Sequence, residues 1–69
     1  MAKTKQETDV TVEGGGSIFL FRPHTDAARD WIEQHVQDDA QWIGGGLVVE
    51  HRYAHDLADG MLQDGLNVR

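Results

Sequence analysis

Three short stretches of the chain have residue patterns typical of strands, and in the first of them Val10 and Val12 alternate with Thr11 and Glu13, the two-residue period of a half-buried strand. The stretches are residues 10–13, 17–22 and 47–52, and the later two are rich in β-branched or aromatic residues. Pro23 ends the second stretch because proline has no N–H to donate to a neighbouring strand. The pattern predicts three strands, the first two joined by a glycine-rich hairpin loop.

Two longer stretches, residues 26–37 and 53–64, repeat apolar side chains three and four positions apart, which places them on one face of a helix. We predict an amphipathic surface helix for each stretch. The positions that form the two faces are Ala28, Trp31, Ile32, His35 and Val36 in the first helix and Ala54, Leu57, Ala58, Met61 and Leu62 in the second.

Residues at the helix ends support these boundaries. Thr25 is placed to accept hydrogen bonds from the first backbone N–H groups of the first helix. Gly65 suits the left-handed position after the second helix, and Leu66 is placed to close that cap with an apolar contact. Gly60 costs about 1 kcal/mol relative to alanine inside a helix, which predicts a close approach by a neighbouring backbone or aromatic ring.

The order of elements predicts an α+β fold. It is strand, strand, helix, strand, helix and a short C-terminal strand over residues 66–69. Right-handed connections would give a two-layer sandwich, with both amphipathic helices on one face of a sheet of three or four strands. Residues 38–43 are interpreted as a loop. Residues 1–9 are predicted to be a disordered tail, and residues 10–69 to form a single compact domain.

The strands carry more large apolar residues than one buried face requires. Alternation buries either Ile18 and Leu20 or Phe19 and Phe21, and it leaves the other pair outside. The predicted interface consists of Phe19, Phe21 and Val48, because an exposed apolar patch on a sheet marks a site of association. The alternative is that the N-terminal segment or a glycine-rich loop covers this face.

The length and the net charge of the chain restrict the kinds of partner that it can bind. A chain of 69 residues buries only about 60% of its unfolded surface, so association is an attractive source of stability. The formal net charge is −6, which makes nucleic acids and anionic membranes poor direct partners. No apolar run is long enough to span a bilayer, and there is no cysteine. These features predict a cytoplasmic protein.

The candidate chemistry is a histidine and carboxylate cluster over residues 50–59. His51, His55 and Asp59 are weak metal ligand candidates, and Glu50 lies beside them. Arg52 occupies the position where a zinc hydrolase motif requires glutamate, and the predicted strand–helix boundary separates the two histidines. Polar histidines at a strand–helix junction are the alternative reading.

Other catalytic motifs are missing from the chain. The two glycine triplets, residues 14–16 and 44–46, lead into strands and lack the lysine of a phosphate-binding loop, so both are interpreted as mobile turns. Ser17 is the only serine and has no obvious base. We therefore predict no catalytic residue and no cofactor.

A run of acidic residues offers a further surface. Asp30, Glu33, Asp38 and Asp39 give the first helix and the segment after it an acidic face. Such a face would dock on a basic protein surface by imitating a phosphate backbone, although most acidic helix faces only interact with solvent.

Several segments together resemble short bacterial and phage proteins of unknown function. They are residues 18–23, Trp31, residues 47–53 and residues 64–66, and the resemblance covers most of the chain after residue 16. It implies a bacterial cytoplasmic setting and carries no activity, ligand or catalytic residue.

The sequence thus predicts a small acidic, non-enzymatic interaction or regulatory protein. It would act through self-association, as a homodimer, or through a protein partner. One alternative is a metal-dependent enzyme at the cluster of residues 50–59, and another is an acidic mimic of nucleic acid.

Overall fold

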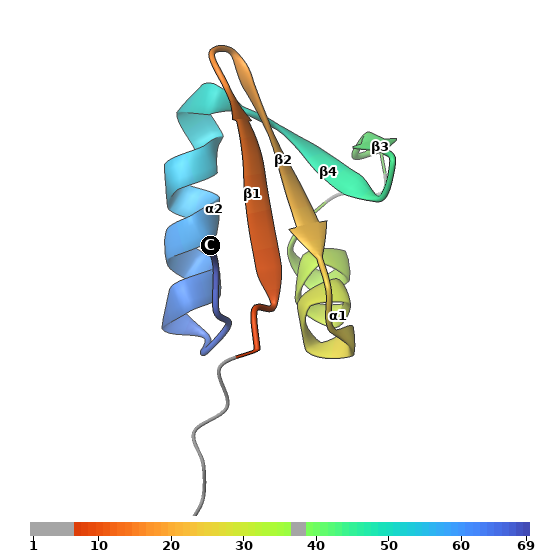
Figure 1. Ribbon diagram of the computed structural model, residues 1–69, viewed down its shortest axis with the longest axis vertical. Helices are drawn as coiled ribbons and strands as arrows, with labels where there is room; N and C mark the ends of the chain where they lie inside the picture. Colours follow the sequence, from red (N-terminus) through yellow and green to blue (C-terminus); the bar gives the residue numbers. More distant parts are fainter. Residues whose placement is uncertain (1–6, 37–38) are drawn as a thin grey trace, which may run out of the picture.

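The computed structural model describes residues 7–36 and 39–69, which form a small α+β fold with a four-stranded antiparallel sheet and two helices (Figure 1). In chain order the elements are β1 (Val10–Gly15), β2 (Ile18–Pro23), α1 (Asp26–His35), β3 (Trp42–Ile43), β4 (Gly46–Glu50) and α2 (His51–Gln63). The strands lie in the order β1-β2-β4-β3. The predicted α+β class is confirmed.

The order of elements differs from the predicted one at two points. Residues 42–43, interpreted as loop, form the short strand β3 that pairs with β4. At the C-terminus, Val68 makes a single parallel bridge with Val10 instead of a full strand, beside β1 in Figure 1.

The second glycine triplet contains a tight turn. Gly44 and Gly45 both have positive φ, 54° and 82°, and they connect Ile43 directly to its sheet partner Gly46. A two-residue hairpin turn of this kind requires left-handed backbone at both central positions, which glycine adopts without a steric penalty. This is why so short a strand as β3 forms at all.

The core lies between the two helices and one face of the sheet. Alternate strand residues Val10, Phe21, Leu47 and Val49 point to that face, and they form one buried cluster with Ala28 and Ile32 of α1 and with Ala54 and Met61 of α2. These four buried helical residues belong to the faces that the three- and four-residue spacing predicted, whereas His35 and Leu62 of the same predicted faces are exposed. Their burial removes apolar surface from water, which is the main stabilisation available to a domain of this size.

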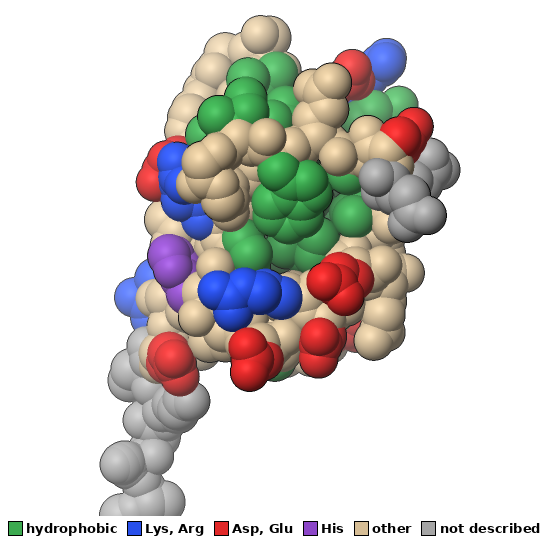
Figure 2. Space-filling view, turned by 90° about the vertical axis from the view of Figure 1, so that its right-hand side faces the viewer, with side chains coloured by type: hydrophobic (Ala, Val, Ile, Leu, Met, Phe, Trp, Pro, Cys, Tyr) green, Lys and Arg blue, Asp and Glu red, His purple; other side chains and the backbone are tan. Residues whose placement is uncertain are grey.

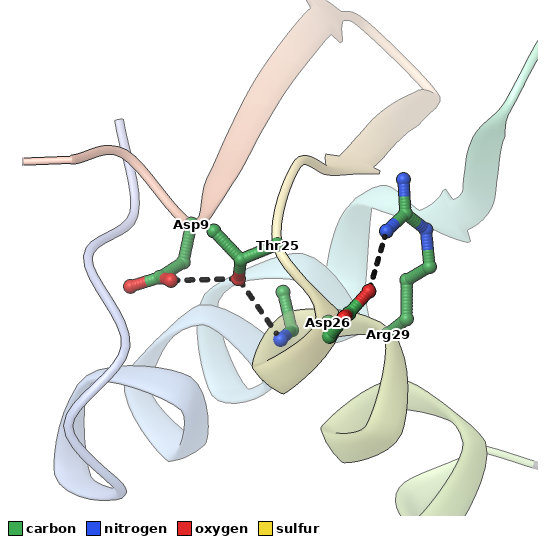
Figure 3. Close-up of polar contacts among 5 residues, drawn as sticks. Asp9, Thr25, Asp26 and Arg29 are labelled. Atoms are coloured by element: carbon green, nitrogen blue, oxygen red, sulfur yellow. Dashed lines mark hydrogen bonds and ion pairs between the residues drawn. The ribbon is translucent and has the colours of Figure 1, made fainter.

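Helix α1 begins where the sequence predicts. The Thr25 hydroxyl oxygen accepts a hydrogen bond from the Ala28 backbone N–H at 3.2 Å, as an N-cap residue does. The same hydroxyl donates to Asp9 Oδ1 at 2.7 Å (Figure 3). Asp9 Oδ2 accepts from the Asn67 backbone N–H at 2.8 Å, so one carboxylate joins the N-terminal segment, the start of α1 and the C-terminal segment.

Part of the predicted tail is therefore in contact with the domain. Besides the bonds of Asp9, the Glu7 carbonyl accepts a hydrogen bond from the Asn67 side-chain amide at 2.9 Å. Residues 1–6 of the predicted tail lie outside the described residues. The described contacts begin before Val10, the first residue of the predicted domain.

The end of α2 confirms the predicted glycine cap. Gly65 has φ of 93°, its N–H donates to Leu62 O at 3.1 Å, and the N–H of Leu66 donates to Met61 O at 3.0 Å. These two bonds form a Schellman cap, which satisfies carbonyl groups that the helix leaves free. Leu66 is buried in the core with Met61, so the cap also holds the C-terminal segment against β1.

Inside α2, Gly60 makes the close approach that its position predicted. A β-carbon built on it would lie 3.4 Å and 3.6 Å from two ring atoms of Trp31. Trp31 also donates from its indole nitrogen to Asp64 Oδ2 at 2.6 Å. These contacts hold α1 against α2.

The two glycines of this region predict opposite outcomes for the same substitution. Gly65→Ala places a β-carbon on left-handed backbone and should lower the free energy of unfolding by about 1 kcal/mol. Gly60→Ala gains helix propensity, and its methyl group reaches the Trp31 ring at ordinary contact distance, so it should raise stability by about 0.5 kcal/mol. Urea unfolding of both variants checks the prediction, and a loss of stability in both would contradict it.

Candidate interaction surface

The face of the sheet that points away from the helices carries a row of apolar side chains. Leu20 lies opposite Val48 in the β2–β4 register, and Ile18 is next but one to Leu20 on the same side. Ile43 pairs with Gly46 and therefore projects to this side too. We call Ile18, Leu20, Ile43 and Val48 the open sheet face.

The open sheet face is partly accessible to solvent. Ile18 is 43% exposed and Ile43 is 56% exposed. Leu20 and Val48, which lie opposite each other on β2 and β4, are half-buried. A β-carbon on Gly46 would lie 3.3 Å from both Leu20 Cβ and Arg22 Cγ, so glycine at this position avoids crowding the two side chains. Within residues 7–36 and 39–69, both helices contribute their buried residues to the opposite face of the sheet.

The structure decides which pair alternation leaves outside. Phe21 is 0% exposed and belongs to the core, and Phe19 is half-buried on the same side, so these two are the inner pair. The choice of Phe19 and Phe21 as surface residues is therefore wrong, and Ile18 and Leu20 are the outer pair. Val48, the third residue of the predicted interface, does lie on the outer side, opposite Leu20.

Charges near the open sheet face are paired. Arg22 Nε lies 3.0 Å from Glu13 Oε1, and both residues project to the outer side of the sheet. The Arg22 guanidinium also donates to the Gly44 carbonyl. At the other end of the face, Arg52 Nε lies 3.2 Å from Glu50 Oε1. The charges of two carboxylates and two guanidinium groups around the open sheet face therefore balance each other.

The helical side of the molecule is acidic in comparison. Helix α1 carries three acidic residues and one arginine, and α2 carries two acidic residues and one arginine. Asp30, Glu33 and Asp39 of the predicted acidic surface are all exposed, and Asp38 lies outside the described residues. On the side that α1 occupies in Figure 1, acidic side chains lie around a central apolar patch, with a basic side chain directly beside the patch (Figure 2).

A groove opens between the C-terminal end of α1, the first half of α2 and β4. Its volume is about 900 Å³. Trp31 and Val36 line one wall, Leu57 lines the other, and Leu47 and Val49 lie at its base. His35 stacks on the Trp31 ring at 3.9 Å between ring centroids, and its Nδ1 hydrogen-bonds the Trp31 carbonyl at 2.7 Å, which fixes the position of that wall.

The histidine cluster is placed differently from the sequence prediction. Helix α2 begins at His51, so His51 and His55 lie one helical turn apart in the same helix and not on either side of a boundary. Both line a hollow of about 420 Å³ with Phe19 and Val12, and the His51 ring lies 5.7 Å from the Phe19 ring. His55 Nδ1 lies 4.0 Å from Asp56 Oδ1.

The carboxylates of the cluster do not complete a metal site with these histidines. Asp59 accepts a hydrogen bond from Gln63 at 3.5 Å, and Glu50 is paired with Arg52. Across the described residues, no group of three or more histidine or acidic side chains is placed to hold a metal ion.

Two exposed residues of this region were missed in the sequence. Trp42 is 46% exposed and Ile43 is 56% exposed, both in β3. The signal that points to them is the pair Gly44 and Gly45 directly between two apolar segments, which is typical of a hairpin turn.

Among the described residues, no helix has both the length and the apolar character needed to cross a membrane. Comparisons of the chain with protein-family models, with curated proteins and with solved structures find no match.

Proposed function

We propose that this chain is a small non-enzymatic interaction protein that associates with a second copy of itself through the open sheet face. The observation that carries the proposal is that Ile18, Leu20, Ile43 and Val48 share the side of the sheet opposite the helices, with Ile18 and Ile43 exposed. Covering these side chains removes apolar surface from water, which stabilises a domain whose own core is small.

The distribution of charge favours a second copy as the occupant. Two chains of net charge −6 repel each other, so they associate best through the least charged surface that each presents. The charged groups beside the open sheet face are paired, whereas the helices on the other side are acidic. Association of two sheets face to face keeps the acidic helices apart, and a twofold axis makes the same patch serve both copies.

Lysines on the open sheet face test the proposal. Ile18→Lys with Ile43→Lys puts two charges per copy into the interface. In a single chain the lysine at position 18 lies opposite Glu50, so it is compatible with the fold. We expect light scattering after gel filtration to give the mass of a dimer for the unmodified chain and 7.7 kDa for the double variant.

The matched control is Tyr53→Lys with Leu62→Lys. These residues are 55% and 54% exposed on α2, and the charge change is the same. This control should remain a dimer. An unmodified chain that is monomeric at a concentration of about 100 μM, or a control that dissociates as readily as the test variant, would contradict the proposal.

A further inference from the structure

We propose that the groove between α1 and α2 binds a basic amphipathic helix of a protein partner. The base of the groove is made by Leu47 and Val49, which point to the inner side of the sheet, and Val48 of the open sheet face also lines it. An apolar groove of this kind takes the apolar face of a helix, with side chains three and four positions apart as anchors.

The walls of the groove offer both aromatic and aliphatic contact. Trp31 is held on one side by its indole hydrogen bond to Asp64 and by the stacked ring of His35. Gly60 of α2 packs near two atoms of this ring, and Leu57 lines the groove on the α2 side. A rigid aromatic wall accepts an apolar side chain without losing much conformational freedom, which favours binding.

The rim of the groove selects the charge of the occupant. Three carboxylates, of Asp39, Glu50 and Asp56, lie among its lining residues with one guanidinium, of Arg52. The charge of Arg52 is balanced by its partner Glu50, so the remaining charges of the rim are the carboxylates of Asp39 and Asp56. Asp39 follows α1 in the chain, and Asp56 lies in α2. Two carboxylates on opposite sides of an apolar groove complement lysine or arginine residues that flank an apolar stripe.

A second copy of this chain cannot supply that helix. Each of its two helices carries more acidic than basic residues, so either one would bring carboxylates to the acidic rim. The occupant is therefore a different protein.

The test uses a helical peptide of about 14 residues made of leucine and lysine, with its leucines at three- and four-residue spacing. Trp42→Phe leaves Trp31 as the only tryptophan, so its fluorescence reports the groove directly. We expect saturable binding with a change in Trp31 emission. A scrambled peptide of the same composition, without an apolar stripe, should bind at least about tenfold more weakly because it keeps only the charge attraction.

Matched charge variants decide whether the rim takes part. Asp39→Asn with Asp56→Asn should weaken binding about fivefold, as expected for two solvent-exposed ion pairs. Asp30→Asn with Asp59→Asn removes the same charge from exposed positions outside the groove and should change binding less than twofold. Ile18→Lys with Ile43→Lys, which tests dimer formation, should leave peptide binding unchanged.

Three results would overturn the groove proposal. They are equal binding of the scrambled peptide, an unchanged Trp31 emission at saturation, and equal losses in the two pairs of Asp→Asn variants. None of them bears on self-association, and a monomeric chain that still binds the ordered peptide would reject only the dimer.

Discussion

Phe21→Ala is expected to leave the chain without a cooperative folded state at 25 °C. Phe21 is fully buried in the second strand of the sheet, where its partners in register are Val12 on β1 and Leu47 on β4. Replacing a buried phenylalanine by alanine costs about 3–5 kcal/mol, from lost transfer free energy and from the cavity that remains. A single core of this size supplies only about 3–5 kcal/mol, so the substitution removes most of the stability.

Two controls separate burial from position in the strand. Phe21→Leu keeps most of the volume and should cost about 1.5 kcal/mol or less, leaving the variant folded. Leu20→Ala changes the adjacent residue on the open sheet face and should be milder than Phe21→Ala because Leu20 is only half-buried. Urea unfolding followed by circular dichroism measures all three, and a Phe21→Ala variant within about 1 kcal/mol of the unmodified chain would contradict the described core.

Asp9→Ala is expected to lower the free energy of unfolding by about 2 kcal/mol. Its carboxylate accepts from the Thr25 hydroxyl at 2.7 Å and from the Asn67 backbone N–H at 2.8 Å, and Asp9 is half-buried. Alanine leaves both donors without this acceptor. The loss acts at three places at once, because the carboxylate joins the residue before β1 to the cap of α1 (Figure 3) and to the C-terminal segment.

The same region contains a matched control. Asp26 is paired with Arg29 at 3.3 Å in the first turn of α1, but its side chain is fully exposed (Figure 3). Asp26→Ala should therefore leave the thermal midpoint almost unchanged, since exposed ion pairs are screened by water and salt. Asp9→Asn, which keeps one acceptor oxygen, should recover about half of the stability lost in Asp9→Ala. If Asp26→Ala were as damaging as Asp9→Ala, the role given to the Asp9 carboxylate would be wrong.

The sequence by itself determined the features that depend on residues within about four positions of one another. The cap at Thr25, the buried positions of both helices and the left-handed Gly65 were predictable, because each follows from local backbone geometry or from helical spacing. Gly60 predicted only that a backbone or an aromatic ring lies near it, and the fold decided that this neighbour is Trp31. The α+β class followed from the order of those elements.

Only the tertiary structure decided which side of the sheet is open. Both Ile18 with Leu20 and Phe19 with Phe21 satisfy alternation, and the choice depends on which side the helices pack against, which no local pattern records. The role of Asp9 was hidden for the same reason, since its partners Thr25 and Asn67 are 16 and 58 positions away. The groove likewise exists only because Trp31, Leu47 and Leu57 come from three elements that the fold brings together.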